Sequence, residues 1–144
     1  MKMSGNKNTN SKRIKGRTIS RGCAEGEVLL IETPISFLGG VNSATGEITD
    51  KESKHDGVSV AGKILVFPSG KGSTVGSYVM YQLKKNKKAP AAIINTECET
   101  IVAVGAIISE IPLLDKTKED PFDILENGDR VIVNATEGWF EIKK

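Results

Sequence analysis

The turn from Ser69 to Thr74, SGKGST, holds the residues of this chain whose types and spacing could do chemistry. Its glycines allow the backbone to approach a ligand closely, and Lys71 adds a positive charge. Positions 75, 78, 79, 82 and 83 follow the spacing of one helical face, so the turn is predicted to lead into a helix N-terminus. Unpaired N–H groups at such a terminus attract anions, and the sequence therefore predicts an anion site here.

Two interpretations are open for Ser73. As the residue before the helix it is a good N-cap, which by itself explains a serine at this position. The helix N-terminus and Lys71 would also stabilise negative charge on the hydroxyl oxygen, which would allow Ser73 to accept a proton. The only histidine, His55, is not near Ser73 in the sequence, which argues against a Ser-His-Asp hydrolase.

Two common phosphate-binding patterns do not fit this turn. A Walker loop requires Ser or Thr directly after Gly-Lys, whereas Gly72 follows Lys71. A Rossmann fingerprint requires Gly-x-Gly-x-x-Gly, whereas Gly70, Gly72 and Gly76 are spaced one residue too far apart. The sequence therefore argues against a nucleoside triphosphatase and gives no dinucleotide-binding fingerprint.

The chain offers no expected metal site and no membrane segment. Cys23 and Cys98 form no CxxC pair, and His55 has no companion at metal-ligand spacing. Apolar runs such as 101–108 are too short to span a bilayer, and the first residues do not form a secretory signal. A cytoplasmic protein with free thiols is predicted.

The 144 residues are the size of one domain, and their charge is distributed unevenly. Residues 1–21 contain seven Lys and Arg and no acid, which leaves thirteen basic and eighteen acidic residues in the remainder. Residues 1–12 are predicted to be a flexible basic tail, and residues 13–144 a single domain. The tail has no aromatic residue to stack on bases, so it is interpreted as a solvated end and not as a nucleic-acid-binding segment.

The pattern of apolar residues predicts a mixed α/β domain with few helices. Strands are predicted at 17–20, 27–32, 62–67, 91–95 and 111–114, a helix from Val75, a short helix or turn within 97–110, and a hairpin over 131–142. A turn is predicted at 21–26. The order strand, helix, strand predicts a parallel, right-handed βαβ unit. The excursion 35–58, with a hairpin around 44–46, has an apolar start that favours an ordered functional loop.

Three stretches resemble a known family: GRTISRGCAEGEVLL (16–30), ISFLGGVNSATGEI (35–48), and 62–115, which begins GKILVFPSGKGSTVG. They are similar to the small subunits of archaeal phosphomevalonate dehydratases, in the aconitase X branch of the aconitase superfamily. The resemblance covers residues 13–142. It implies a swivelling β/β/α domain, equivalent to the mobile fourth domain of aconitases, present here as a separate chain.

The resemblance also implies an activity and a partner. The family dehydrates (R)-5-phosphomevalonate to trans-anhydromevalonate 5-phosphate, in the archaeal mevalonate pathway of isoprenoid biosynthesis. The large subunit would complete the enzyme as a heterodimer or a larger assembly and would carry a [4Fe-4S] cluster, with no cofactor bound by this chain. The chain alone would be inactive.

The family's proton-accepting serine lies in a Gly-Lys-Gly-Ser turn, which matches residues 70–73, so the resemblance gives that role to Ser73. Dehydration of a 3-hydroxy acid requires a base for the carbon-bound proton and a Lewis acid for the hydroxyl group. The second role would belong to the cluster iron of the large subunit. Lys71 and Arg17 are expected to face the substrate phosphate or carboxylate; alternatively they are solvated or pair with the large subunit. The expected substrate-binding residues are Gly70, Lys71, Gly72, Thr74 and Arg17.

Three alternatives stay open. Aconitase X relatives that act on hydroxyproline derivatives carry a cysteine after the serine, whereas Thr74 stands here and favours the mevalonate branch. A phosphate-carrying swivelling domain would use a histidine, but His55 lies away from any glycine turn. A non-catalytic anion-binding module would depend on Lys71 and the basic tail.

Overall fold

The computed structural model describes residues 12–50, 54–71 and 75–143. The strands in these ranges are β1 (Arg13–Lys15), β2 (Arg17–Ser20), β3 (Cys23–Leu30), β4 (Ile64–Phe67), β5 (Ala92–Asn95), β6 (Leu113–Asp115), β7 (Arg130–Asn134) and β8 (Trp139–Lys143). The helices are α1 (Phe37–Gly40), α2 (Val75–Lys85), α3 (Thr100–Ile108) and α4 (Pro121–Ile124). The predicted mixed α/β class is therefore confirmed.

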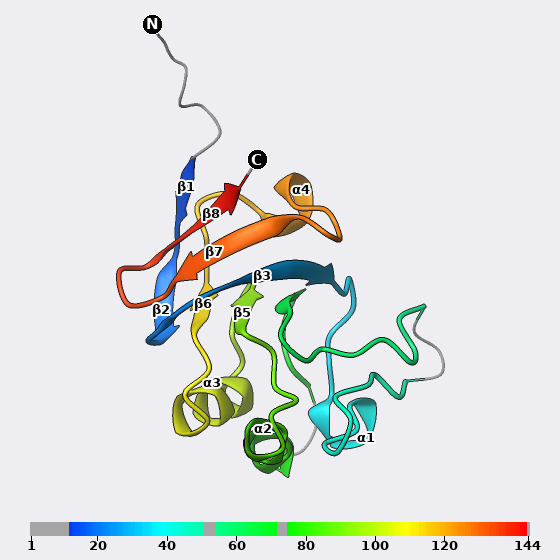
Figure 1. Ribbon diagram of the computed structural model, residues 1–144. Helices are drawn as coiled ribbons and strands as arrows, with labels where there is room; N and C mark the ends of the chain where they lie inside the picture. The colour runs from blue at the N-terminus through cyan, green and yellow to red at the C-terminus, as the bar shows by residue number, and fades with distance from the viewer. Residues whose placement is uncertain (1–11, 51–53, 72–74, 144) are drawn as a thin grey trace, which may run out of the picture.

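The strands of the described ranges form one sheet in the order β1-β8-β7-β3-β4-β5-β6-β2. From β3 to β6 the strands are parallel, and the strands on both sides of this central part are antiparallel to their neighbours. Figure 1 shows that the sheet folds over, with β7 and β8 above β3 and the larger helices on the opposite side of the parallel strands. The result is the β/β/α layering that was predicted.

The N-terminal strands lie at the two ends of this strand order. β1 pairs with β8 and β2 pairs with β6, although only Gly16 separates β1 from β2 along the chain. The Gly16 N–H donates to the Gly138 carbonyl at 2.9 Å. A Cβ at Gly16 would lie 2.8 Å from Thr117 Cγ2, so a side chain there would require its neighbours to move. Glycine therefore allows the chain to pass from one end of the strand order to the other.

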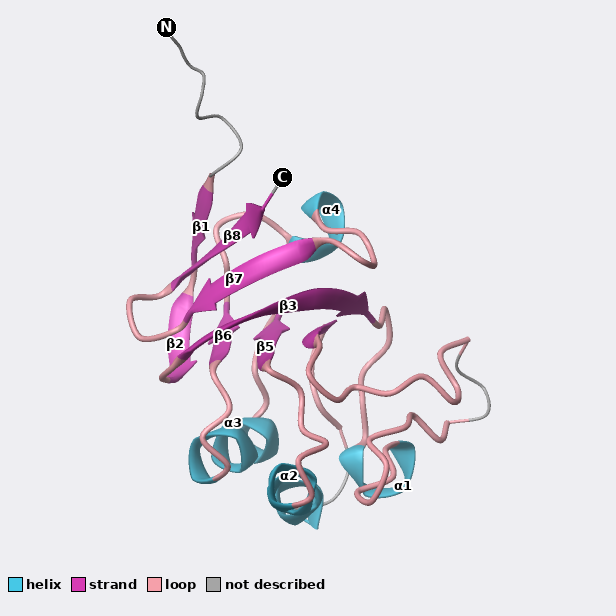
Figure 2. Ribbon diagram, in the orientation of Figure 1, coloured by secondary structure: helices cyan, strands magenta, loops and turns pink. Residues whose placement is uncertain are grey.

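Alternate residues of the parallel strands face two separate apolar cores. Leu65 and Phe67 of β4 belong to the core under the helices, whereas Ile64 and Val66 belong to the core shared with β7 and β8. All four side chains are fully buried. Burial on both faces explains why these strands are continuous apolar runs in the sequence. Figure 2 shows α2 and α3 gathered on one side of the strands.

The central prediction of parallel βαβ units is confirmed. β4 pairs in parallel with β5 across α2, and β5 pairs in parallel with β6 across α3. The carboxyl ends of these strands therefore meet at one edge of the sheet, where ligand sites of open parallel sheets form. The C-terminal hairpin of β7 and β8 and the small hairpin around 44–46, closed by the bridge between Val41 and Ile48, are also confirmed.

Two local predictions were wrong. The predicted turn at 21–26 is limited to its first two residues, because Cys23–Glu27 pair with β7 as part of β3. The small residues there serve packing: a Cβ at Gly26 would lie 2.9 Å from the Gly62 carbonyl. The helical face predicted for α2 included Val75 and Tyr78, which are 45% and 57% exposed. Val79 and Leu83 of the predicted face are buried, and they share the buried face with Gly76 and Met80.

Apolar residues lie on both sides of α2, so their spacing alone could not show which stripe faces the sheet. The short elements β1, α1 and α4 were not predicted, because three or four residues are too few for a periodic pattern. Among the helices of the described residues, none has the length and apolar character needed to cross a membrane.

Candidate functional site

The segment that follows β4 lies at the carboxyl edge of the parallel strands. The Ile35 N–H donates to the Ser69 carbonyl at 3.1 Å, and the Lys71 N–H donates to the Ile35 carbonyl at 3.0 Å. These two bonds tie the 69–71 segment to the start of the 35–50 excursion, with a parallel bridge between Ile35 and Gly70. The described parts of the predicted loop and of the predicted glycine turn are therefore joined by backbone hydrogen bonds.

Gly70 is buried where this segment meets α3. A Cβ added at Gly70 would lie only 2.3 Å from Val102 Cγ2, and Val102 is itself 2% exposed. Even alanine would therefore force either the turn or the first turn of α3 to move. The glycine that suggested close approach of a ligand is required, in this structure, by close approach of a helix.

Gly72, Ser73 and Thr74 lie outside the described residues, so three of the predicted site residues have no structural description. The helix predicted to follow them is present, and α2 begins at Val75. Gly76, in its first turn, lies close to Phe37 and to Ile101, since a Cβ there would be 3.8 Å and 3.6 Å from them. The start of α2 therefore lies between the excursion and α3.

A pocket of about 390 Å³ opens beside Lys71. Its walls come from the segment after β3 and from the excursion, and include Pro34, Leu38, Gly39, Gly40 and Thr49. Gly39 has φ +86°, a left-handed conformation that favours glycine. Lys71 also lines an adjoining pocket of about 490 Å³ with Lys54 and His55. The predicted cation therefore lies at a hollow of the size that takes a small molecule.

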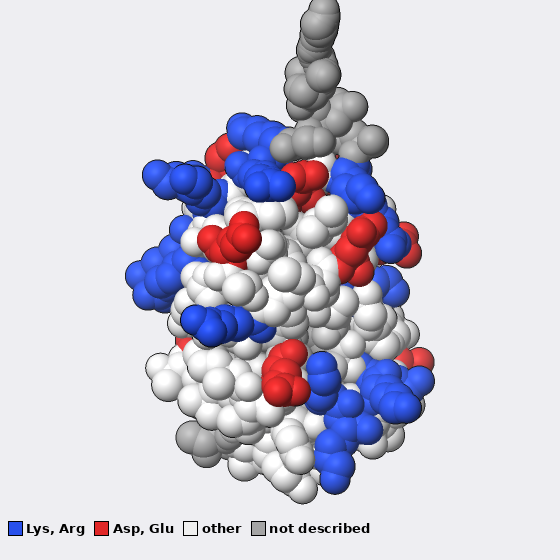
Figure 3. Space-filling model, turned by 60° about the vertical axis from the view of Figure 1, so that its left-hand side comes forward, with Lys and Arg blue, Asp and Glu red and all other residues white. Residues whose placement is uncertain are grey.

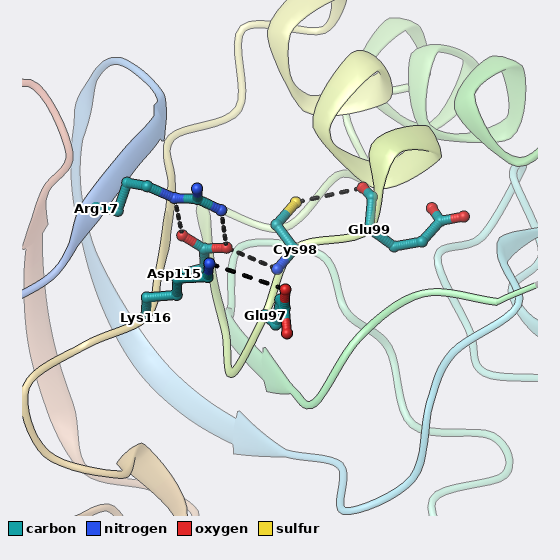
Figure 4. Close-up of polar contacts among 6 residues, drawn as sticks. All are labelled: Arg17, Glu97, Cys98, Glu99, Asp115 and Lys116. Carbon is teal, nitrogen blue, oxygen red and sulfur yellow. Dashed lines mark hydrogen bonds and ion pairs between the residues drawn. The ribbon is translucent and has the colours of Figure 1, made fainter.

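Arg17 has a different environment, which Figure 4 shows. Its Nε and Nη2 each donate to a carboxylate oxygen of Asp115 at 2.8 Å. Asp115 is fully buried, whereas the Arg17 side chain is 51% exposed. The hydrogen bonds and charge of Asp115 raise the pKa of Arg17. Substrate binding by Arg17 stays a prediction, and this structure gives the guanidinium a partner within the chain.

Asp115 also joins β6 to the segment before α3. One of its carboxylate oxygens accepts a hydrogen bond from the Cys98 N–H at 2.7 Å. Burial, with Asp115 and Glu99 as nearby carboxylates, raises the pKa of the Cys98 thiol to about 12. We name Arg17, Asp115 and Cys98 the arginine cluster. β2, which carries Arg17, is three strands from β4 in the sheet, a distance of about 14 Å between the two strands, so Arg17 and Lys71 belong to different parts of this edge.

Sequence reasoning missed two acidic residues at this edge. Asp115 ends the apolar strand β6, and Glu99 caps α3 by accepting hydrogen bonds from the Ile101 and Val102 N–H groups. A carboxylate directly after a buried strand, and a carboxylate before an apolar helix, are signals that the sequence contains. The pairing of Asp115 with Arg17 could not be read from it, because the two residues are 98 positions apart.

The described residues contain no group of three His, Cys, Asp or Glu side chains placed to hold a metal ion. The whole chain has two cysteines, fewer than the three or four cysteine ligands that a [4Fe-4S] cluster ordinarily takes. One of them, Cys98, has the raised pKa described above, which disfavours the thiolate that ligation requires. The residues of this chain therefore do not fit a cluster site of their own.

Comparison with known proteins gives consistent results. The family model described as "Aconitase X swivel domain" matches residues 13–142. The phosphomevalonate dehydratase small subunit of Methanosarcina mazei is 64% identical over 132 residues, which are 92% of this chain and 92% of that protein. The protein of the same name from Thermococcus kodakarensis is 58% identical over 130 residues, 90% of this chain and 96% of its own length.

Two solved structures have the same fold. The crystal structure of Thermococcus kodakaraensis aconitase X in its holo form matches with a TM-score of 0.87 and 57% identity, over 92% of this chain and 99% of the other. The solution NMR structure of a UPF0107 protein matches with a TM-score of 0.84 and 51% identity, over 92% of this chain and 100% of the other. The family expected from the three sequence stretches is therefore confirmed.

Proposed function

We propose that this chain, which belongs to the aconitase X swivel-domain family, is the small subunit of a two-chain phosphomevalonate dehydratase. The reaction is the loss of water from (R)-5-phosphomevalonate to give trans-anhydromevalonate 5-phosphate. The observation that carries this proposal is the 64% identity, over 92% of both chains, to a relative named phosphomevalonate dehydratase small subunit. A large subunit is the partner, and a cytoplasmic location is part of the same proposal.

Ser73 is the proton acceptor in this proposal. In the elimination the C–H bond beside the carboxylate breaks, its electron pair forms the double bond, and the hydroxyl group leaves to become water. Ser73 accepts the proton as an alkoxide and becomes a hydroxyl group. The departing hydroxide takes up one proton to form water, and Ser73 loses its proton again before the next turnover, so the net products are the alkene and water. Two observations on either side of Ser73 support the role: Lys71 lies at a pocket, and α2, whose N-terminus is the positive end of the helix dipole, begins at Val75.

Substrate binding is proposed for Gly70, Gly72 and Thr74 through the backbone N–H groups of the turn. For Lys71 it is proposed through the ammonium group, because the Lys71 N–H already donates to the Ile35 carbonyl. Both ends of the substrate are anionic, and Lys71 lies at a pocket large enough for one of them. Arg17 is a weaker candidate, because Asp115 already engages two of its three nitrogens. An iron–sulfur cluster of the large subunit would supply the Lewis acid for the departing hydroxyl group.

The test is the turnover of the assembled enzyme with single substitutions in this chain. Ser73→Ala, co-expressed with the large subunit, is expected to assemble and to lose activity by roughly a thousandfold, because a positioned base contributes that much. The substitution removes one helix cap, so the free energy of unfolding should fall by about 1 kcal/mol. Ser69→Ala is the matched control, since only the Ser69 carbonyl is used in the turn, and it should keep near-normal turnover.

Exchange of the substrate C–H proton with D₂O measures the proton step separately from water loss. Ser73→Ala should abolish this exchange. An assembled Ser73→Ala enzyme with near-normal exchange and turnover would show that Ser73 is not the base. Turnover of hydroxyproline derivatives, with none of phosphomevalonate, would identify the aconitase X-type hydroxyproline dehydratase instead.

A further inference from the structure

We infer that the outward faces of α2 and α3 form the surface on which the large subunit docks, an inference that rests on the proposed function. Six of the eight large apolar side chains exposed among the described residues lie on these two helices. They are Val75, Tyr78 and Tyr81 of α2, and Val104, Ile107 and Ile108 of α3. We call this set the outer helix face.

The six side chains form two stripes on neighbouring helices. On α2 they recur at every third residue, and on α3 at positions i, i+3 and i+4, so each set lies along one side of its helix. The helices are in close contact, because a Cβ at Gly105 of α3 would lie 2.5 Å from Met80 Sδ and 3.1 Å from Ser77 Cα of α2. The two stripes therefore lie side by side.

The outer helix face is more apolar than a helix surface that contacts only water would be. α3 has the sequence TIVAVGAII, without a charged residue, and Ile107 and Ile108 are 54% and 53% exposed. In Figure 3 the lower left of the molecule, at the level of the helices in Figure 1, shows an area without Lys, Arg, Asp or Glu, while Lys and Arg side chains gather on the lower right. Apolar areas with few charges and with tyrosines are typical of the centre of stable protein interfaces.

Continuity with the Lys71 pocket indicates which partner covers this face. Val75 begins α2 beside α1, and Leu38 of α1, 47% exposed, lines the pocket. A subunit that brings catalytic groups to this pocket must reach Leu38, and α1, which carries Leu38, is in contact with α2. The apolar surface continues from there along α2 and α3, so one partner can cover the pocket and the outer helix face together.

Two further features of this chain indicate what the matching surface of the partner must provide. Lys84 and Lys85 end α2, and the Lys85 ammonium group lies 5.9 Å from the centre of the Tyr81 ring. A recess of about 570 Å³ lies beside Ile107, between β2 and the end of α3. The fitting surface on the large subunit is apolar, fills this recess with a side chain, and carries carboxylates opposite the two lysines.

The experiment measures the affinity of this chain for the large subunit of the same organism, by calorimetry or biolayer interferometry. Ile107→Asp and Tyr81→Asp should each weaken binding by about thirtyfold or more, because a charge at the centre of an apolar interface is desolvated without a partner. Val58→Asp is the matched control, since Val58 is apolar, 37% exposed and not on these helices. It should change affinity by less than about threefold.

The outcomes separate this inference from the proposed function. At a saturating concentration of the variant chain, kcat should return to the wild-type value, because the substituted residues do not touch the reacting groups. Thermal unfolding of each variant alone verifies that the domain is folded. Wild-type affinity of both variants for the large subunit would overturn the docking face and leave the proposed function intact.

A wild-type chain that does not bind the large subunit at all would overturn the proposed function. A second copy of the chain is the remaining occupant of the outer helix face. Sedimentation velocity of the chain alone would identify it, as self-association that both variants abolish while affinity for the large subunit is unchanged. That result would also overturn the inference.

Discussion

Lys71 and Arg17 lie at the same carboxyl edge of the sheet, but their surroundings are opposite. Lys71 forms no ion pair with the described residues and lines two pockets. Arg17 is held by two hydrogen bonds from its guanidinium to the buried Asp115, which is bound in turn by the Cys98 N–H. One half of the edge is therefore open to a ligand, and the other half is occupied by contacts within the chain.

This difference shows why charge alone does not identify a binding residue. From the sequence both cations were candidates for the substrate phosphate or carboxylate. A guanidinium that is already paired with a carboxylate has lost most of its attraction for a second anion, whereas an ammonium group at a pocket retains it. The structure therefore gives Lys71 the stronger case for substrate binding, and it gives Arg17 a role in joining β2 to β6.

The largest expected effect on stability follows removal of Asp115. Asp115→Ala takes away the acceptor of two Arg17 N–H groups and of the Cys98 N–H at a fully buried position. We expect the free energy of unfolding to fall by about 3 kcal/mol, which corresponds to a lower Tm by roughly 10 °C. Denaturant and thermal unfolding of the chain measure it. Lys71→Ala should leave the Tm unchanged. An equal fall in Tm for both variants would contradict the view that Asp115 holds the fold together at this edge while Lys71 is open to a ligand.

The next largest effect concerns Gly70. Gly70→Ala places a Cβ against Val102, and we expect a loss of about 2 kcal/mol in the free energy of unfolding from overpacking. Gly40→Ala is the control, because no atom lies within 4 Å of a Cβ built at Gly40. Its change should be within about 0.5 kcal/mol.

A double-mutant cycle tests the cause of the Gly70 effect. Val102→Ala removes the methyl group in question, so the double variant should lose less stability than the sum of the two single variants. Strict additivity of the two losses would show that contact with Val102 is not what requires glycine at this position.

A smaller effect is expected for turnover when Lys71 is replaced. Lys71→Ala should lower kcat/KM of the assembled enzyme by about tenfold, the value of one charge-assisted hydrogen bond to a substrate anion, with no change in Tm. Lys71→Arg should keep part of the activity. Lys15→Ala, at an exposed lysine of β1 away from the pocket and from the outer helix face, is the control. If the two alanine variants had equal kcat/KM, Lys71 would have no role in binding.

The parallel core could be predicted from the sequence because its signals are local and repeated. The runs at 62–67 and 91–95 are β-branched, apolar and bounded by turn residues, which is the pattern of strands buried on both faces. The helix between them begins after a glycine turn and ends in lysines. Three stretches were also enough to recognise the family, since the longest of them, 62–115, is specific.

Long-range contacts explain what could not be predicted. The residues 23–26 read as a turn because they are small, but their size serves the pairing of β3 with β7 and the approach of Gly62 to Gly26. The partner of Arg17 depends on β2 reaching the edge beside β6. The exposed side of α2 depends on where α3 packs. None of these contacts leaves a periodic signal within a short window of sequence.

For the candidate site, too, the sequence predicted some features, and others could be learned only from the structure. Lys71 and Gly70 were chosen for charge and backbone freedom, and the structure places both at the carboxyl edge. For Gly70 the physical reason differs from the expected one, because Val102 requires the glycine. The role of Ser73 stays a prediction, since Ser73 lies outside the described residues.

The smallest effect at neutral pH is expected for Cys98. Its rate of alkylation tests how well the arginine cluster is shielded from reagents in solvent. Burial and the nearby carboxylates Asp115 and Glu99 raise the pKa of the Cys98 thiol from 9.0 to about 12. Since a thiolate and not a thiol is the nucleophile, Cys98 should react with iodoacetamide at pH 8 at least about a hundredfold more slowly than an unperturbed thiol. Peptide mapping after timed alkylation measures both cysteines in one sample, with the exposed Cys23 as the internal control.

The raised pKa also fixes the direction of a pH effect on stability. The folded state favours the protonated thiol, so this contribution to stability is complete below pH 9 and is lost as the pH rises from 9 toward 12. Cys98→Ser, which does not titrate there, should show less loss of stability over this pH range. Alkylation of Cys98 as fast as that of Cys23 at pH 8 would mean that the segment before α3 opens readily, and that the arginine cluster does not hold this half of the edge closed.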